Sequence, residues 1–329
     1  MARRWPIPRF WTSDRPAYTV ERQRQLQDWP RVTDSSISDQ DVRDRALEIG
    51  HAILKAQDAH CQPDPPFSTK IHLIIPASMP SGQRLCAKVR LKAVRAQLEG
   101  TRVPFNPLEL RTFQLLDNRF AWAPKLIDFA PDTSWILREW LGTGTLRDLV
   151  GAPVPRAVLE NVWQLFAEAF DAFHNRDAPW LIRDLKPQNI AMDGTRLALF
   201  DFNTAMSLEA VRSGSFSNRL GRAKDGNLYN PPELLTSQCP DARISSDYFA
   251  FATLVSVLIT GASRPIWSNA LAAPDTALAQ YRAEYAAAIP ELLGAARKAG
   301  LGEDRGAFLI SSLNPVPDAR PSRFVAKDR

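Results

Sequence analysis

Hydrophobic and polar positions in the first third of the chain alternate with two different periods. Over residues 39–58 apolar side chains recur three or four positions apart, which predicts an amphipathic helix. Ser38 is a candidate N-cap of this helix. After a proline-rich break at 62–67, the runs 70–75 and 84–91 are rich in β-forming residues and flank a polar turn, so they predict a β-hairpin.

Further along, helical spacing begins after a proline in segment 107–117, and two short strands are expected at 125–129 and 134–139. Beyond about residue 142 helical patterns dominate, and only the neighbourhood of 189–201 predicts short strands. The expected helical segments are 145–150, 156–175, 245–260, 276–299 and 304–313. A strand-rich part followed by a helix-rich part indicates an α+β protein with two lobes.

These patterns divide the chain into three expected parts: an N-terminal extension over 1–66, which combines a basic tail with the helix at 39–58, a smaller lobe over 67–139, and a larger lobe over 140–329.

The net charge of +5 is concentrated in the tail, where residues 1–24 carry six arginines against two acids. We expect a solvated extension, although an acidic partner or a membrane surface is also compatible with it. No interleaving of basic and aromatic residues recurs later, so a nucleic-acid partner is not expected.

The composition narrows the class of protein further. With 329 residues and 45% hydrophobic residues, the chain can bury a large core. The longest apolar run, at 249–259, is too short to span a bilayer, so no transmembrane segment is expected. The three cysteines are far apart and form no CxxC pair, which predicts reduced thiols in an intracellular protein.

The segment 182–203, with sequence IRDLKPQNIAMDGTRLALFDFN, carries the most informative chemistry. It resembles the catalytic loop of protein kinases followed by their magnesium-binding motif. The resemblance implies that Asp184 orients a hydroxyl nucleophile and accepts its proton, and that Lys186 offsets charge near the γ-phosphate of ATP. It also implies that Asn189 and Asp201 supply oxygen ligands to Mg²⁺.

Other segments match the same family in the same order, so the resemblance covers about residues 67–325. Lys88, in CAKV, would contact the α- and β-phosphates and pair with Glu109. Glu139, Trp140 and Leu141 would offer backbone groups to the adenine edge. The resemblance further implies two supporting roles: Asp247 holding the backbone of the catalytic loop, and Glu233 forming a buried ion pair with Arg320. Apart from the resemblance, His174 is expected to be a structural histidine near a helix end.

Four positions depart from the family pattern. No GxGxxG precedes Lys88, and the first strand with its phosphate loop would have to come from about 45–66, where Gly50 is the only glycine. The other departures are Ile182 for the histidine before Arg-Asp, Asn203 for the glycine after Asp-Phe, and Arg138 before the hinge glutamate. Asn203 is expected to hold Asp201 in one orientation.

Three functions remain open from the sequence. The first is an ATP- and Mg²⁺-dependent protein Ser/Thr kinase, favoured by the pattern Asp-Leu-Lys-Pro-x-Asn, with Arg183 available to pair with a phosphate on Ser213, Ser215 or Ser217. The second is a pseudokinase, a nucleotide-binding or scaffold module that acts on a protein partner. The third, less favoured, is a small-molecule kinase of the aminoglycoside-phosphotransferase type.

Overall fold

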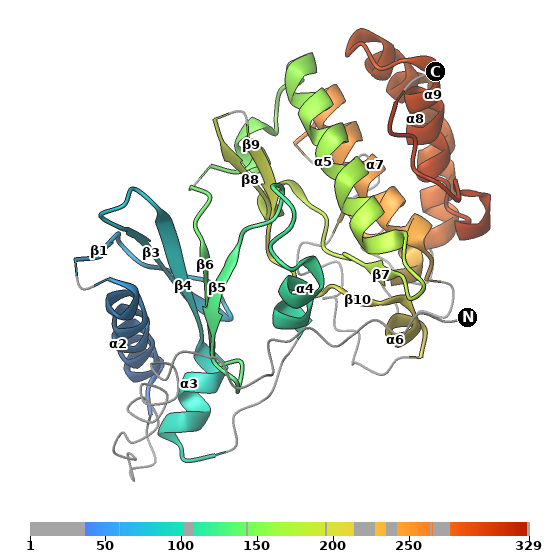
Figure 1. Cartoon of the computed structure of the whole chain (residues 1–329). Coiled ribbons are helices and arrows are strands. Elements are labelled where there is room, and N and C mark those ends of the chain that lie inside the picture. The colour runs from blue at the N-terminus through green and yellow to red at the C-terminus, as the bar shows by residue number, and fades with distance from the viewer. Residues whose placement is uncertain are drawn as a thin grey trace, which may run out of the picture. The chain divides into compact units, whose positions relative to one another are not determined.

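The chain, in a computed structural model, forms two compact units (Figure 1). One comprises Met1–Phe105 and Ile127–Arg138, and the other comprises Asn106–Leu126 and Glu139–Arg329. The structure describes residues 37–58, 60–101, 108–142, 144–194, 196–213, 228–234, 242–263, 265 and 277–327.

A six-stranded sheet forms the centre of the first unit. Its order is β1-β3-β4-β6-β5, with β2 also pairing β3. The hairpin of β3 and β4 is antiparallel, with Ile74 opposite Lys88, which confirms the predicted hairpin. The strands are β1 (Gln62–Pro63), β2 (Phe67–Ser68), β3 (His72–Ser78), β4 (Arg84–Arg90), β5 (Leu126–Phe129) and β6 (Trp135–Glu139).

The edge of this sheet differs from the glycine-loop hairpin of the resembled family. Two short strands, β1 and β2, lie along β3, and β2 connects to it through a tight turn at Thr69. The Thr69 hydroxyl oxygen accepts hydrogen bonds from the backbone N–H of Ile71 (3.2 Å) and His72 (2.9 Å). The Thr69 side chain, together with the bond from Thr69 N to His72 O (2.8 Å), therefore closes this hairpin. The hairpin turn lies outside the segment 45–66, where the phosphate loop was expected.

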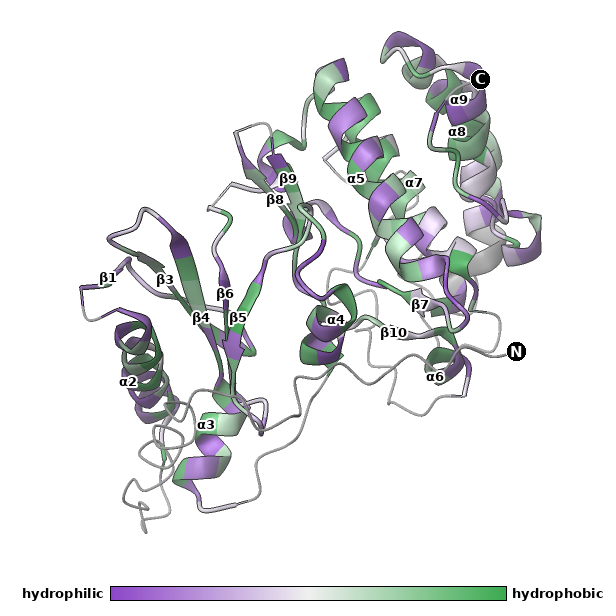
Figure 2. Ribbon diagram, viewed as in Figure 1, coloured by the Kyte–Doolittle hydropathy of each residue, from purple (hydrophilic) through white to green (hydrophobic). Residues whose placement is uncertain are grey.

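Helix α2 (Asp39–Gln57) confirms the predicted amphipathic helix and its N-cap. The Ser38 hydroxyl accepts from Asp41 N (3.1 Å), and Asp41 Oδ2 accepts from Ser38 N (2.8 Å), which is a reciprocal capping box. Hydrophilic and hydrophobic residues lie on different faces of the helix (Figure 2). Its apolar side chains join one buried cluster with residues from the sheet, among them Leu73, Ile75, Ala77, Leu85, Ala87 and Val89.

Helix α2 thus lies in the same compact unit as the sheet. The domain ranges expected from the sequence stay a prediction. Gly50, the glycine of the segment expected to form a phosphate loop, lies in a helix and not in a loop. Gly50 lies inside α2, where a Cβ atom would overlap Ile75 Cδ1. Ile75 is fully buried, so the missing side chain is what lets the helix approach β3 closely.

Replacing Gly50 with valine is expected to destabilise the protein by about 1–3 kcal/mol, because the added methyl groups overfill a packed interface. Urea unfolding would show a lower midpoint. Ala52→Val, at an exposed position of the same helix, adds bulk without this contact and should shift the midpoint much less. Equal midpoints for the two variants would contradict the packing role of Gly50.

Helix α3 (Leu91–Leu98) was not anticipated, because the strand pattern of 84–91 runs directly into it. The helix begins where β4 ends, and Arg95 ties it to the start of α2. The Arg95 guanidinium donates to Ile37 O (3.0 Å) and to Asp39 Oδ1 (2.5 Å). These contacts join residues that are 58 and 56 positions apart in sequence.

The second unit is mainly helical, as the sequence predicted. The central helix α7 is buried from Ser245 to Ile259 on all its faces, and it is hydrophobic over most of its length (Figure 2). In the part of the chain that the structure describes, no helix is both long and apolar enough to cross a membrane. The helices are α4 (Leu108–Leu116), α5 (Arg156–His174), α6 (Leu208–Arg212), α7 (Ile244–Thr260), α8 (Ala277–Lys298) and α9 (Glu303–Ser312).

Two small sheets complete this unit. Strands β8 (Ile190–Asp193) and β9 (Arg196–Leu199) form an antiparallel hairpin, and β10 (Met206–Ser207) pairs with β7 (Trp180–Leu181). The segment expected to be helical at 145–150 is a 3₁₀ helix, η2 (Leu146–Leu149). Gly142, with φ 89°, and Gly144 lie just before this 3₁₀ helix.

Candidate functional site

The residues predicted to carry chemistry in the second unit lie on one connection between small strands. The loop 182–189 leaves β7 and ends in the 3₁₀ helix η3 (Pro187–Asn189), where Pro187 occupies the first helical turn. The hairpin β8–β9 follows and leads to Asp201. Short strands therefore fix both ends of the loop that carries the polar side chains.

Asp184 is the centre of the polar contacts in this loop. Lys186 Nζ donates to Asp184 Oδ2 (2.7 Å), and Asn189 Nδ2 donates to the same oxygen (3.0 Å) and to Asp184 O (2.9 Å). The other carboxylate oxygen, Oδ1, is buried and has no hydrogen-bond partner among the residues that the structure describes. Three predicted site residues are thus in direct contact.

Asp247, at the start of α7, holds the backbone at the beginning of the loop. Its carboxylate accepts from Ile182 N (2.8 Å), from Arg183 N (2.9 Å) and from His174 Nε2 (2.9 Å). The side chains of Asp247 and His174 are 0% and 2% exposed, so these hydrogen bonds form away from water. This geometry agrees with the structural roles expected for both residues.

Arg183 has a left-handed backbone conformation, with φ 72°. Such a conformation is costly for a residue with a Cβ and is maintained by its surroundings. Here the Asp247 carboxylate fixes the Arg183 backbone N–H, and the guanidinium donates to Thr204 O (3.2 Å). The side chain expected to bind a phosphate therefore contacts the segment after Asp201.

The segment Asp201–Asn203 shows how its departure from the family pattern works. Asp201 also has positive φ, 67°, and its Oδ1 accepts a short hydrogen bond from Asn203 Nδ2. The unusual backbone conformation is at Asp201 and not at Asn203. Between them Phe202 is fully buried, with its ring 5.6 Å from that of Phe113 in α4.

The β8–β9 hairpin relates Asn189 to Asp201. Ile190 pairs with Leu199, and Phe200 N donates to Asn189 O (3.0 Å) at the end of the ladder. Residue 189 and residues 200–201 therefore lie at the same end of the hairpin.

These residues fit the oxygen ligands that Mg²⁺ requires. Asn189 Nδ2 faces Asp184, so its carbonyl oxygen Oδ1 receives no donor from the described residues. Asp201 supplies a carboxylate whose orientation Asn203 fixes. In the described ranges, no group of three or more His, Cys, Asp and Glu side chains could hold a metal ion.

Lys88 and Glu109 belong to different compact units. Lys88 is 5% exposed at the middle of β4, on the face opposite Ala87 and Val89, which pack towards α2. Glu109 is 8% exposed in the first turn of α4. Their pairing stays a prediction.

Glu139, one of the predicted hinge residues, has a partner that the sequence did not suggest. Arg196 NH1 donates to Glu139 Oε1 (2.9 Å), and its NH2 donates to Ala121 O (2.9 Å). Burial alone would raise the pKa of Glu139, but the hydrogen bond and charge of Arg196 and the Lys125 backbone N–H outweigh it, so the net pKa lies below its usual range. Only a tertiary contact, 57 residues apart in sequence, identifies Arg196.

Leu141 is 2% exposed and packs in a small apolar cluster with Ala191 and Ala198 of the β8–β9 hairpin. Its side chain is therefore part of the second unit's core. The contribution of its backbone to nucleotide binding stays a prediction.

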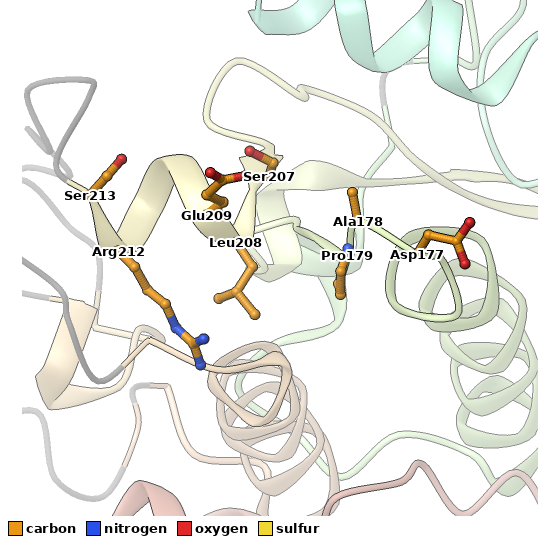
Figure 3. A pocket seen from close by; sticks show the side chains of 8 residues that line it. All are labelled: Asp177, Ala178, Pro179, Ser207, Leu208, Glu209, Arg212 and Ser213. Carbon is orange, nitrogen blue, oxygen red and sulfur yellow. The ribbon is translucent and has the colours of Figure 1, made fainter. Parts of the chain in front are cut away.

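A surface pocket of ≈530 Å³ lies beside α6 (Figure 3). Leu208 and Arg212 extend from this helix into the space next to Pro179. Ser213, one of the three candidate phosphate acceptors, also lines the pocket, whereas Ser215 and Ser217 lie outside the described residues. Arg212 Nε already donates to Ala242 O (2.8 Å).

Of the three cysteines, Cys61 and Cys86 are buried thiols, and Cys239 lies outside the described residues. Burial raises the pKa of the Cys61 thiol, and the nearby charges of Asp58 and Asp64 raise it further. The Cys61 thiol is therefore less nucleophilic than a free cysteine in water.

No family model matches the chain. The chain is similar to a chain in a structure of the CAK complex from Chaetomium thermophilum bound to ATP-γ-S, with a TM-score of 0.57 and 16% sequence identity. The similarity covers 82% of this chain and 90% of that chain. At this identity the likeness shows the fold: the chain has an α+β, kinase-like architecture, with a β-sheet N-terminal region and a helical C-terminal part.

Proposed function

We propose that this chain, which has a kinase-like fold, is an ATP- and Mg²⁺-dependent phosphotransferase that acts on serine or threonine hydroxyls of proteins. One observation supports the proposal most directly: Asp184 keeps Oδ1 buried and unpartnered while Lys186 and Asn189 hold Oδ2. A buried carboxylate oxygen without a donor costs free energy. That cost is understandable if the oxygen gains a donor when a substrate hydroxyl enters and displaces the atoms that cover it.

The chain's own residues would divide the work as follows. Asp184 Oδ1 accepts the hydroxyl proton and orients the nucleophile, while the bond to Lys186 and Asn189 prevents rotation of the carboxylate. Lys186 carries positive charge next to Asp184 and offsets charge that develops on the transferred group. Asn189 Oδ1 and the Asp201 carboxylate would hold Mg²⁺, which when bound neutralises phosphate charge.

The remaining predicted residues would bind the nucleotide. Lys88 would contact the phosphates with Glu109 as its partner, and the backbone near Glu139 and Leu141 would meet the adenine edge. Glu139 N already donates to Lys125 O (2.9 Å), so the adenine contacts are assigned to other backbone groups of 139–141. The expected partners are the nucleotide and a protein substrate, and we place the protein inside the cell.

A second candidate function is a pseudokinase, which binds nucleotide or a protein partner with little turnover. The Thr69 turn favours it, because a hairpin closed by a side chain offers fewer backbone N–H groups to phosphates than a glycine-rich loop. A small-molecule kinase is the least supported. The buried ion pair of Glu233 and Arg320 belongs to the features by which the sequence resembled protein-directed members.

Thermal unfolding with ATP and Mg²⁺ tests nucleotide binding in the first two candidates. A ligand present at 100 times its Kd should stabilise the folded chain by about 2.7 kcal/mol, which raises the Tm by several degrees. Because the site offers Mg²⁺ few protein ligands, we expect Mg²⁺ alone to leave the Tm unchanged and to add to the shift only with ATP. Asp201→Ala should abolish that added part.

Asp193→Ala is the matched control, since Asp193 is an exposed acid at the turn of the same hairpin. Its response to ATP and Mg²⁺ should equal that of the unmodified protein. ADP release then separates the two candidates: turnover supports the phosphotransferase, whereas a Tm shift without turnover supports the pseudokinase. Absence of any shift would reject both nucleotide-binding functions.

A further inference from the structure

We propose that the C-terminal residues 323–327 form a strap that positions the 182–189 loop, with Phe324 as its anchor. The effect on turnover rests on the proposed phosphotransferase function, but the effect on the loop does not. Phe324 contacts neither the loop nor the polar residues of the site, so it is a positioning residue.

The Phe324 ring occupies an aromatic cage formed by α5, α7 and α9. The ring centroids of Phe170, Phe251 and Phe308 lie 5.1, 5.2 and 5.1 Å from that of Phe324. Trp163 and Tyr248 complete the cage at 5.8 and 6.1 Å. Three of these contacts are edge-to-face, the geometry that the charge distribution of aromatic rings favours.

Two hydrogen bonds from side chains to backbone carbonyl groups hold the part of the strap that follows Phe324. Trp163 Nε1 donates to Val325 O (2.6 Å), and Arg305 NH2 donates to Ala326 O (2.9 Å). Arg305 is itself fixed by Glu160 of α5 (2.7 Å), and its guanidinium lies 5.0 Å from the Trp163 ring centre. The strap is therefore attached by named polar contacts and does not rest on Phe324 alone.

The cage is continuous with the residues that hold the loop. His174 stacks on Phe170, with ring centroids 4.8 Å apart and an angle of 13° between the rings. Its ring also lies 5.3 Å from that of Tyr248, which adjoins Asp247 in α7. His174, which bonds to Asp247 Oδ2 (2.9 Å), is thus packed against two rings that touch Phe324.

Small displacements of Asp247 matter because the loop depends on it. The Asp247 carboxylate is the hydrogen-bond acceptor for two consecutive backbone N–H groups, those of Ile182 and Arg183. Arg183 is in a strained conformation that needs such support. Asp184, with its unpartnered Oδ1, is the next residue along the chain. Removing the Phe324 ring leaves a cavity into which Phe170 and Tyr248 can relax, and His174 and Asp247 then shift.

Hydrogen exchange of the full-length chain tests the structural part. In Phe324→Ala, we expect the Ile182 and Arg183 amides to exchange at least about tenfold faster, because their acceptor is less well held. Amides of the β3–β4 hairpin in the other compact unit should keep their rates. Steady-state kinetics should show kcat reduced by about tenfold with little change in the KM for ATP, since misplacement of Asp184 affects the reacting geometry.

Tyr285→Ala is the matched control. Tyr285 is a partly buried aromatic residue of α8, and its hydroxyl donates a hydrogen bond to Ile310 O of α9 (2.9 Å). Among the described residues it touches no ring of the cage. We expect Tyr285→Ala to lower the Tm. Exchange of the Ile182 and Arg183 amides should then become faster only by as much as the loss of global stability accounts for. Phe324→Leu keeps much of the volume but loses the edge-to-face ring contacts, so it should accelerate exchange at Ile182 and Arg183 less than Phe324→Ala does. If the alanine variant does not fold, unchanged exchange of these two amides in Phe324→Leu overturns the proposal.

The proposal is overturned if Phe324→Ala leaves the two amides unchanged, or if it accelerates all core amides equally. If the unmodified protein shows no turnover, the phosphotransferase proposal fails, and local exchange at Ile182 and Arg183 still decides whether the strap positions the loop. If turnover is present and kcat is unchanged in Phe324→Ala despite faster exchange, the strap does not position Asp184 and the proposal is rejected.

Discussion

Asp184→Asn is expected to lower the rate of phosphotransfer by about 10²–10⁴-fold, because the amide cannot accept the proton that the carboxylate accepts. The two side chains have nearly the same shape, and Lys186 is partly exposed, so the fold should persist. Labelling of protein by Mg-ATP, with ADP release as a second readout, measures the loss. Binding of ATP, followed by the Tm, should change little.

Asp193→Asn makes the same chemical change at an exposed acid of the neighbouring hairpin and should keep full activity. The catalytic role of Asp184 is supported if Asp184→Asn lowers the rate of phosphotransfer while ATP binding stays the same. Loss of both in Asp184→Asn would indicate a structural role. Full activity of Asp184→Asn would remove the main support for the proposed phosphotransferase.

Arg320→Ala is expected to cost about 3–5 kcal/mol of folding stability, because it leaves the Glu233 carboxylate buried without its counter-ion. The two side chains are 0% and 7% exposed and form a bidentate pair, with N–O distances of 2.5 and 3.1 Å. Arg320 also donates to Asn314 O (2.7 Å) and lies over the Phe249 ring. Urea unfolding of the purified variants measures the effect.

A nearby surface pair supplies the control. Asp318 binds Arg243 at 2.7 Å, but its side chain is 74% exposed, so Asp318→Asn should change stability by no more than about 1 kcal/mol. The double replacement Glu233→Gln with Arg320→Met should be less destabilising than Arg320→Ala alone, since no uncompensated charge remains. A loss in Arg320→Ala no larger than that in Asp318→Asn would contradict a structural role for the buried pair.

Periodicity alone located most elements to within a few residues. Helix α2 was expected over 39–58 and spans Asp39–Gln57, and α5 was expected over 156–175 and spans Arg156–His174. Both carry apolar residues on one face, and a pattern repeated over five turns is a strong local signal. Helix α3 was missed because its start overlaps the strand pattern that ends at Leu91, and eight residues give a weak signal.

The sheet edge could not be derived from the sequence for a physical reason. Gly50 is the only glycine of segment 45–66, where the sequence placed a possible phosphate loop, and glycine is common in such loops. The role of Gly50 depends on Ile75, which lies 25 residues away and approaches only when the helix packs on the sheet. The strands β1 and β2 are two residues long, and their hydrogen bonds to β3 create them.

The sequence by itself determined the elements and the kinds of side chain at the site, because helix and strand periods and the order of acidic, basic and amide residues are local properties of the chain. Only the tertiary structure decided which of those side chains meet. It placed Lys186 and Asn189 on one oxygen of Asp184, aimed Asp247 at two backbone amides, and gave Glu139 its partner Arg196. Such contacts join residues up to 65 positions apart, and their geometry is set by the packing of whole helices and strands, which no local pattern encodes.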